Sequence, residues 1–258
     1  MKALITGASS GLGREMARIL SKKGYDIIAV ARRRERLEEL KSELETDVEI
    51  LCADVRDVEV CKEIAKRADE VDVFINNAGF GVFGALSETD LDRELDMINT
   101  NVCAVHILTK LVTQKFMEKN SGYILNVASL AAFFPGPLFA AYYASKAYVL
   151  RLSQALWEEM RRDGCNVSIS VLCPGPVHTE FGDVARVNFG LGNEKGKKFI
   201  VLTSKDVAEY AIKKMFKKKL VIIPGHLMKV AAFLRRILPD KIMAKIVCLI
   251  QREKCITK

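Results

Sequence analysis

The chain alternates continuous apolar runs with segments of helical spacing, and this order constrains its fold more than any other feature. Seven runs rich in Val, Ile and Leu occur, at residues 3–5, 27–30, 48–51, 71–75, 123–127, 167–172 and 220–223. They lack the polar–apolar alternation of a half-exposed sheet, so both faces of each strand should be covered. Helical spacing is found between them, at residues 12–22, 35–44, 58–68, 102–117 and 142–160. The alternation predicts an α/β fold with a doubly wound parallel sheet of about seven strands.

This pattern accounts for most of a 258-residue chain in which half of the residues are apolar, enough to bury a large core. No linker, repeat or low-complexity run precedes Pro224. We therefore expect a single domain over residues 1–225, followed by a basic, amphipathic helical extension over residues 226–258. In the extension, two apolar segments, 227–238 and 242–250, are separated by Pro239.

Positive charge is concentrated at the end of the chain. Residues 213–258 hold thirteen Lys and Arg against two acidic residues, a net +11, so the other 212 residues carry −3 of the total of +8. On a helix, Lys241, Lys245 and Arg252 fall in one narrow stripe among apolar residues, a pattern typical of helices that lie on membrane surfaces. The apolar face could equally pack over a pocket or against another subunit. The basic residues are not interleaved with aromatic residues as in surfaces that bind nucleic acid, so no nucleic-acid partner is expected.

Seven cysteines, at positions 52, 61, 103, 165, 173, 248 and 255, show no CxxC pair and no metal-ligand spacing. Such a scattered, odd set is typical of buried, reduced thiols and predicts a cytoplasmic location. The chain enters a strand at once, so no signal peptide is expected. No 18 consecutive residues are apolar, so no spanning helix is expected. No cluster of His, Cys and Asp predicts a metal.

A glycine-rich turn follows the first apolar run and reads Thr6-Gly7-Ala8-Ser9-Ser10-Gly11-Leu12-Gly13. Small residues let the backbone approach a pyrophosphate, and the helix that follows supplies free N–H groups and partial positive charge. A tight strand-to-helix turn could need the same glycines for packing alone. Because the motif follows the first strand, it favours a dinucleotide-binding turn.

The end of the second run indicates which dinucleotide is bound. A carboxylate there would bind the adenosine ribose of NAD, but the sequence reads Val30-Ala31-Arg32-Arg33-Arg34. Arg32 and Arg33 could instead pair with the 2′-phosphate of NADP(H). Three arginines at a helix start oppose the helix dipole, which favours a bound anion over a plain charged surface.

Further motifs follow in order along the chain: Asp54-Val55, Asn76-Asn77-Ala78-Gly79, Ser129, Tyr142-Tyr143-Ala144-Ser145-Lys146 and Pro174-Gly175. Together with the glycine turn, this series resembles the classical short-chain dehydrogenase/reductases over residues 1–223. The resemblance implies a Rossmann-type dinucleotide-binding catalytic domain, a small-molecule carbonyl or alcohol substrate, and a homodimer or homotetramer.

The spacing of two of these residues suggests the chemistry. Tyr142 and Lys146 are four residues apart, on one face of a helix. Because an ammonium group stabilises a phenolate, we expect Lys146 to lower the pKa of Tyr142 from about 10 and make it a general acid/base. The resemblance adds that Ser129 holds the substrate oxygen and that Lys146 binds the nicotinamide ribose. It also implies that Asn101 supports a proton-relay water, with Asn99 as a rival.

The remaining cofactor contacts are those that the resemblance implies. They comprise Gly7, Ser9, Ser10, Gly11, Leu12 and Gly13 at the phosphates, Asp54 and Val55 at the adenine, Asn77, Ala78 and Gly79 at the adenosine ribose side, and Pro174, Gly175, Val177 and Thr179 at the nicotinamide. Asp57, rather than Asp54, is expected to cap the next helix.

The substrate is predicted by class only. Phe133, Phe134, Pro137 and Phe139 near Ser129, with the partly apolar segment 180–202, indicate an apolar carbonyl compound. The tail resembles those of family members that act on lipid-like substrates, which implies a lipid-like compound as the narrower hypothesis. The motifs together predict an NADP(H)-dependent oxidoreductase that interconverts a carbonyl and an alcohol. An NAD-linked alcohol dehydrogenase and a non-catalytic NADPH-binding sensor or scaffold are the alternatives.

Overall fold

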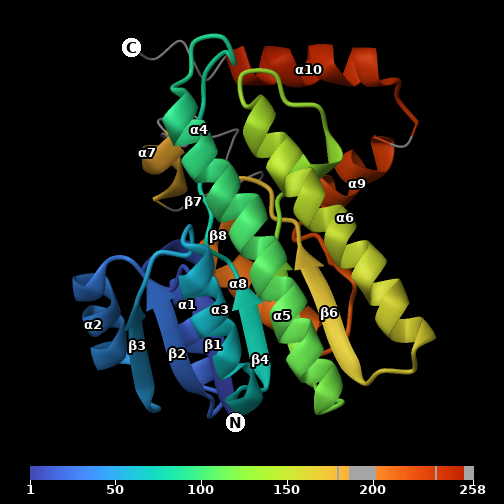
Figure 1. The fold of residues 1–258 in the computed structure, drawn as a ribbon. Helices are drawn as coiled ribbons and strands as arrows, with labels where there is room; N and C mark the ends of the chain where they lie inside the picture. Colours follow the sequence, from blue (N-terminus) through green and yellow to red (C-terminus); the bar gives the residue numbers. More distant parts are fainter. Residues whose placement is uncertain (179, 186–201, 236, 253–258) are drawn as a thin grey trace.

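The computed structural model describes residues 1–178, 180–185, 202–235 and 237–252, which form a layered α/β structure (Figure 1). Seven parallel strands make the central sheet, in the order β3-β2-β1-β4-β5-β6-β9. Their bounds are β1 (Lys2–Thr6), β2 (Asp26–Ala31), β3 (Val48–Cys52), β4 (Val73–Asn76), β5 (Gly122–Val127), β6 (Val167–Leu172) and β9 (Val221–Ile222). Each overlaps one of the seven predicted runs, so the predicted fold class is confirmed.

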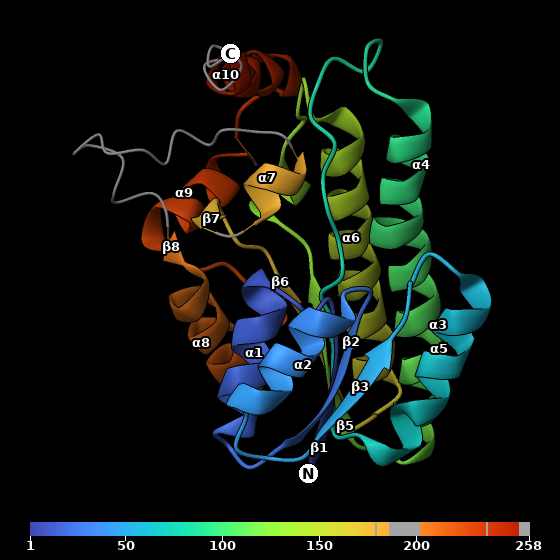
Figure 2. The same ribbon diagram turned by 90° about the vertical axis from the view of Figure 1, so that its left-hand side faces the viewer.

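Helices cover both faces of this sheet, which is why its strands are apolar throughout (Figure 2). One face packs against α1 (Gly11–Ser21), α2 (Arg34–Glu43) and α8 (Ser204–Met215). The other packs against α3 (Val58–Lys66), α5 (Val105–Glu118) and α6 (Ala140–Arg162). Along β1, Leu4 faces the α5 layer and Ile5 the α1 layer, and both are fully buried.

Some local features were predicted and others were not. Asp57 caps α3 as expected, since its carboxylate accepts the N–H groups of Glu59 and Val60 at 2.8 and 3.3 Å. The helix expected from residue 102 begins earlier, because α4 (Leu91–Ile98) runs through a π-helical turn η2 (Asn99–Ala104) into α5. Short elements not predicted are η1 (Arg67–Glu70), η3 (Leu130–Phe133), α7 (Phe181–Ala185) and the paired strands β7 (Val177–His178) and β8 (Leu202–Thr203).

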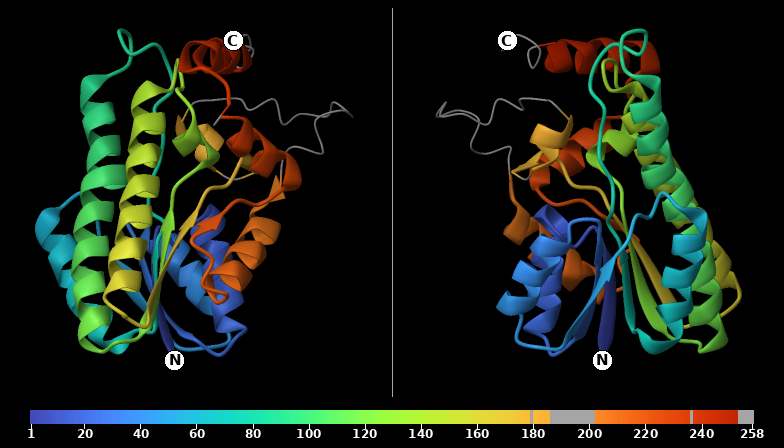
Figure 3. Two further views of the ribbon diagram at one scale, coloured as in Figure 1. Left: turned by 90° about the vertical axis from the view of Figure 1, so that its right-hand side faces the viewer. Right: turned by 60° about the vertical axis from the view of Figure 1, so that its left-hand side comes forward.

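The C-terminal extension contains two helices, α9 (His226–Leu234) and α10 (Asp240–Arg252), on either side of Pro239. Figures 1 and 3 show α10 lying across the end of the molecule toward which the strands point, with the N-terminus at the opposite end. Among the described residues, no helix combines the length and the hydropathy needed to cross a membrane.

The cysteines match their prediction only in part. The six that lie in the described part of the chain are all free thiols. Cys61 and Cys173 are buried, but Cys52 and Cys103 are exposed. The expectation of buried thiols is therefore met by Cys61 and Cys173, is wrong for Cys52 and Cys103, and holds only in part for the half-buried Cys165 and Cys248. Cys52 ends an edge strand, and Cys103 lies on the outer side of the π-helical turn.

Candidate active site

A cavity of about 970 Å³ opens at the carboxyl ends of the strands. The strand order reverses between β1 and β4, and parallel sheets of this kind bind ligands in the crevice at that point. Most of the predicted site residues line this one cavity: Gly7, Ser9, Ser10, Gly11, Leu12, Arg32, Arg33, Asp54, Val55, Asn77, Ala78, Gly79, Ser129, Tyr142, Lys146, Pro174, Gly175 and Val177. Gly13 and Asn101 lie outside its lining, and Thr179 lies outside the described residues.

The glycine turn is fixed by contacts between the ends of β1 and β4. The Thr6 hydroxyl accepts the N–H groups of Asn77 and Ala78, both at 3.0 Å, and the Asn77 amide donates to the Thr6 carbonyl at 3.0 Å. A β-carbon on Gly13 would lie 2.3 Å from the Gly7 carbonyl oxygen. Gly13 therefore lets α1 approach the turn closely, whereas the Gly7 and Gly11 positions, with φ near +68° and +53°, shape the turn itself.

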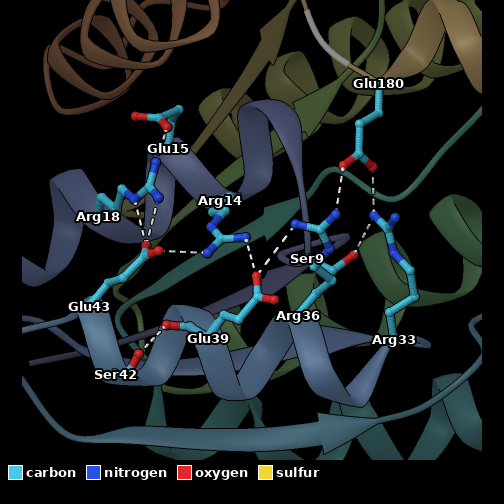
Figure 4. Close-up of polar contacts among 10 residues, drawn as sticks. All are labelled: Ser9, Arg14, Glu15, Arg18, Arg33, Arg36, Glu39, Ser42, Glu43 and Glu180. Carbon is cyan, nitrogen blue, oxygen red and sulfur yellow. Dashed lines mark hydrogen bonds and ion pairs between the residues drawn. The ribbon is translucent and has the colours of Figure 1, made fainter.

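Arginines stand at the end of the cavity expected to hold the adenosine (Figure 4). Arg33 donates to the Ser9 hydroxyl at 3.2 Å and pairs with the Glu180 carboxylate at 2.9 Å. Arg36 approaches the same carboxylate at 3.8 Å. Burial tends to raise the pKa of Glu180, but the hydrogen bond from Arg33 and the charges of both arginines outweigh it and lower that pKa.

Asp54, the predicted adenine contact, lies in the same part of the cavity. Its carboxylate accepts the backbone N–H of Arg56 at 3.0 Å and two guanidinium bonds from the same residue at 2.9 and 2.7 Å. Arg32 is 3.9 Å away. Burial would raise the pKa of Asp54, but these bonds lower it, so the group is a carboxylate held in a fixed orientation.

Tyr142 and Lys146 come from one face of α6, and Ser129 comes from the residue before η3. All three line the cavity, with Tyr142 and Lys146 buried. Lys146 Nζ donates to the Val127 carbonyl at 3.0 Å and lies 5.8 Å from the centre of the Tyr142 ring. The Ser129 side chain hydrogen-bonds Tyr142. The predicted trio is thus brought together at one place.

The pKa values differ from the sequence-based expectation. Burial raises the pKa of Tyr142 well above its ordinary value, and the hydrogen bond with Ser129 offsets only part of this. Burial also lowers the pKa of Lys146 to about 8. The expected lowering of the Tyr142 pKa by Lys146 is therefore not found in the protein alone, because desolvation favours the neutral form of both groups.

Asn101 lies behind this trio in the π-helical turn, a local distortion often found at functional sites. Its side chain is fully buried, accepts the Phe80 N–H at 3.1 Å and donates to the Phe80 carbonyl at 2.8 Å. It also donates to the Ser145 hydroxyl at 3.1 Å. Gly79 passes between Asn101 and Lys146, since a β-carbon there would lie 2.8 Å from Asn101 Oδ1 and 3.2 Å from Lys146 Nζ.

Aromatic side chains form the wall around Tyr142. Phe139 stacks on its ring at a centroid distance of 4.6 Å, and Phe181 packs at 5.3 Å. Phe134 lines the cavity as well, but Phe133 packs into a separate cluster beneath it. The apolar residues Val187, Phe189 and Leu191 of the predicted segment lie outside the described residues.

Sequence reasoning missed two residues that line the cavity, Glu180 and Gln251. Glu180 meets Arg33, and Gln251 of α10 donates to the Tyr143 hydroxyl at 2.7 Å. Tyr143, interpreted from the sequence as plain packing, therefore links α6 to the extension. The 108-residue separation of that pair leaves no local signal in the sequence.

These surroundings fit a dinucleotide. One end of the cavity carries Arg32 and Arg33, the glycine turn and the start of α1 lie along it, and Tyr142 with Lys146 marks the other end. Cations suit a phosphorylated ribose, backbone N–H groups at a helix start suit a pyrophosphate, and a buried acid/base pair suits the reacting ring.

Comparison with known proteins agrees with this geometry. Residues 1–188 match the family model for the short chain dehydrogenases. The chain is 31% identical over 216 residues to an NADP-dependent 3-hydroxy acid dehydrogenase of Escherichia coli O6:H1, covering 81% of this chain and 86% of that protein. It is similar to the structure of a Sphingobium yanoikuyae short-chain dehydrogenase in complex with NADPH, with a TM-score of 0.78, 29% identity and coverage of 87% and 88% of the two chains. It is also similar to a Burkholderia phymatum short-chain dehydrogenase/reductase in complex with NAD, with a TM-score of 0.80, 26% identity and coverage of 91% and 92%.

The chain therefore belongs to the short-chain dehydrogenase/reductase family and is an oxidoreductase with a Rossmann-type nucleotide-binding fold. The cofactor of this class is NAD(P). Because the two similar structures hold different forms of it, the preference has to be argued from this chain's own residues.

Proposed function

We propose that this protein is an NADP(H)-dependent carbonyl reductase with Tyr142 as its proton donor. The observation that carries the proposal is the meeting of Ser129, Tyr142 and Lys146 in one apolar cavity that also reaches Arg33. The free thiols support a reducing, cytoplasmic location.

When bound, the nicotinamide cofactor would supply the hydride for the carbonyl carbon. The chain's own residues bind and protonate the carbonyl oxygen of the substrate. Ser129 donates a hydrogen bond to it and holds it beside Tyr142, whose phenol delivers the proton as negative charge develops on that oxygen. Since burial keeps the pKa of Tyr142 high, the phenol carries its proton at neutral pH. Lys146 stabilises the phenolate left behind, and Asn101 holds the backbone around Phe80 in place next to Lys146.

Support for NADP(H) over NAD(H) comes from charge. Arg32 and Arg33 line the adenosine end of the cavity. They stand at the end of β2, where a carboxylate would be needed to bind a ribose 2′-hydroxyl. A 2′-phosphate would meet the Arg33 guanidinium and the Ser9 hydroxyl, which already lie within hydrogen-bond distance of each other.

The substrate class follows from the wall of the cavity. Phe139 and Phe181 pack against Tyr142, and Phe134 lines the same cavity. Met228, Leu234, Met243 and Ile246 extend the apolar surface outward along α9 and α10. A ketone or aldehyde with a large apolar body would bury it there, while a small polar substrate would leave most of this surface unused.

The test is a screen of apolar and polar carbonyl compounds, followed by loss of NADPH absorbance, with Tyr142→Phe measured beside the wild type. Loss of the hydroxyl should lower turnover by a factor of about 10²–10⁴ while NADPH binding and folding persist. Ser129→Ala should reduce turnover with little change in NADPH affinity. Full activity of Tyr142→Phe on a substrate that the wild type reduces would overturn the mechanism. NADPH binding without turnover of any carbonyl would favour a sensor or scaffold.

A further inference from the structure

The side chains of α10 form three stripes along the helix, one buried and two exposed. Met243, Val247 and Gln251, four residues apart, are buried against the body of the protein. A second stripe is apolar and exposed, and it consists of Ile242, Ile246, Leu249 and Ile250. The third stripe holds the exposed Lys241 and Lys245. One face of α10 therefore packs over the cavity, as one reading of the sequence allowed, and the exposed apolar stripe runs beside that face.

The exposed apolar surface continues onto α9 and the turn between the helices. We call this surface the tail patch, and its members are Leu227, Val230, Phe233, Leu234, Ile237, Ile242, Ile246, Leu249 and Ile250. Nine large apolar side chains exposed within 24 residues exceed what isolated surface positions produce. In the described part of the chain, no other segment has such a concentration of them.

The tail patch adjoins the mouth of the cavity. Leu234 of α9 and Ile246 and Ile250 of α10 belong to the patch and also line the cavity. Met228 anchors α9 on the other side, since a β-carbon on Gly175 would lie 2.7 Å from its sulfur. A surface that covered the patch would therefore face the opening through which an apolar substrate enters.

The charge around the tail patch is positive. Exposed Lys229, Lys241 and Lys245 lie on the same two helices. Asp240 is the one acidic residue between positions 213 and 252, and it pairs with Arg235. Apolar side chains bordered by unopposed lysines complement a layer of acyl chains beneath anionic headgroups. A second copy of the chain docked through this face would instead bring two strongly basic surfaces together.

We propose that the tail patch docks on an anionic lipid bilayer, with α9 and α10 lying in its interface and the cavity opening toward the lipid. The substrate would then be an amphiphile whose carbonyl reaches Tyr142 while its apolar body leaves the bilayer between the two helices. This substrate class rests on the proposed function, whereas the docking itself does not.

The experiment is co-sedimentation of the full-length protein with vesicles of phosphatidylcholine mixed with phosphatidylserine, and with vesicles of phosphatidylcholine alone. We expect binding to the mixed vesicles that is weaker on pure phosphatidylcholine and weaker in raised salt. Lys241→Gln and Lys245→Gln should each weaken it by about fivefold. Leu249→Glu, at a side chain 64% exposed, should weaken it by roughly tenfold or more.

Met117→Glu is the matched control. Met117 is also an exposed apolar residue, but it lies at the C-terminal end of α5, near the start of β5. It is therefore at the amino-terminal ends of the strands, on the opposite side of the molecule from the cavity. The Met117→Glu variant should bind vesicles as the wild type does. Neither Leu249 nor Met117 lines the cavity, so NADPH-dependent reduction of a water-dispersed carbonyl should be unchanged in both variants.

Other results would overturn the docking. Absence of vesicle sedimentation by the wild type would do so, and so would equal loss in Leu249→Glu and Met117→Glu. A change of oligomeric state in Leu249→Glu, measured by light scattering, in a wild type that ignores vesicles would assign the patch to a second copy. Vesicle binding with no carbonyl reduction would retain the docking and reject the proposed function.

Discussion

The contact between Arg33 and Glu180 permits a prediction about cofactor selection. The carboxylate of Glu180 forms an ion pair, at 2.9 Å, with the Arg33 guanidinium that we expect to bind the 2′-phosphate (Figure 4). Arg36 lies 3.8 Å from the same carboxylate. An incoming 2′-phosphate would compete with Glu180 for Arg33. Glu180→Gln should therefore strengthen NADPH binding, whereas Arg33→Ala should weaken it, and neither change should affect NADH.

The magnitudes follow from exposure. The side chains of Arg33 and Glu180 are 47% and 40% exposed, so the pair contributes about 0.2–1 kcal/mol after solvent screening. Removing the competitor should lower the dissociation constant for NADPH by up to about fivefold. Losing the hydrogen bonds of a charged guanidinium to phosphate costs about 1.5–3 kcal/mol, so Arg33→Ala should raise the constant by roughly 10- to 150-fold.

Isothermal titration with NADPH and NADH would measure both effects on the same preparations. Arg34→Ala supplies a control, since Arg34 pairs with Glu38 on the outer side of α2 and does not line the cavity. Equal affinity of the wild type for the two cofactors would refute the assignment of Arg33. Weaker NADPH binding by Glu180→Gln would refute the competition, because it would make Glu180 a support for the phosphate site.

Three further predictions concern stability and pH. Gly13→Ala should lower the free energy of unfolding by about 1–3 kcal/mol and the melting temperature by several degrees in a thermal melt, since its β-carbon would meet the Gly7 carbonyl; an unchanged melt would show that α1 can shift. Tyr143→Phe should cost about 1 kcal/mol through loss of the Gln251 hydrogen bond while NADPH binding persists; a melt like that of the wild type would mean that α10 is held by its apolar contacts alone. The kcat/KM for reduction should be level below pH 8 and fall above it, because Lys146 loses its proton there while Tyr142 keeps its own; a rise with pH would contradict both pKa shifts.

The sheet could be predicted because its signal is local. Seven apolar runs gave seven strands, and the Thr6–Gly13 turn marked the edge at which the cavity opens. Helix α8 was not predicted, although Val207, Ala211 and Met215 repeat with helical spacing and Thr203 caps the helix by accepting the Asp206 N–H. That signal was present in the sequence. The start of α4 was harder to see, because Leu91 and Leu95 are exposed and do not mark a buried face.

The identity of the catalytic trio was predictable, but its electrostatics were not. Spacing along α6 places Tyr142 and Lys146 on one face, whereas burial depends on residues far away in the chain, such as Phe181. The same holds for Glu180 and Gln251, whose partners are distant in sequence. Patterns within one element predict which side chains share a face. The desolvation that sets their pKa values comes from the assembled fold.

Burial acts on the two titrating groups in opposite directions, and this bears on the direction of the reaction. A raised pKa keeps Tyr142 protonated, which is the form that carbonyl reduction consumes. Alcohol oxidation needs the phenolate, which requires positive charge close by. Lys146, 5.8 Å from the ring centre, supplies that charge only below its own pKa of about 8. In the protein alone, the pH that would ionise Tyr142 is therefore one at which Lys146 has become neutral. The Tyr-x-x-x-Lys motif is compatible with both directions, and the apolar wall around it keeps the Tyr142 phenol protonated, which is the form that the proposed reduction uses.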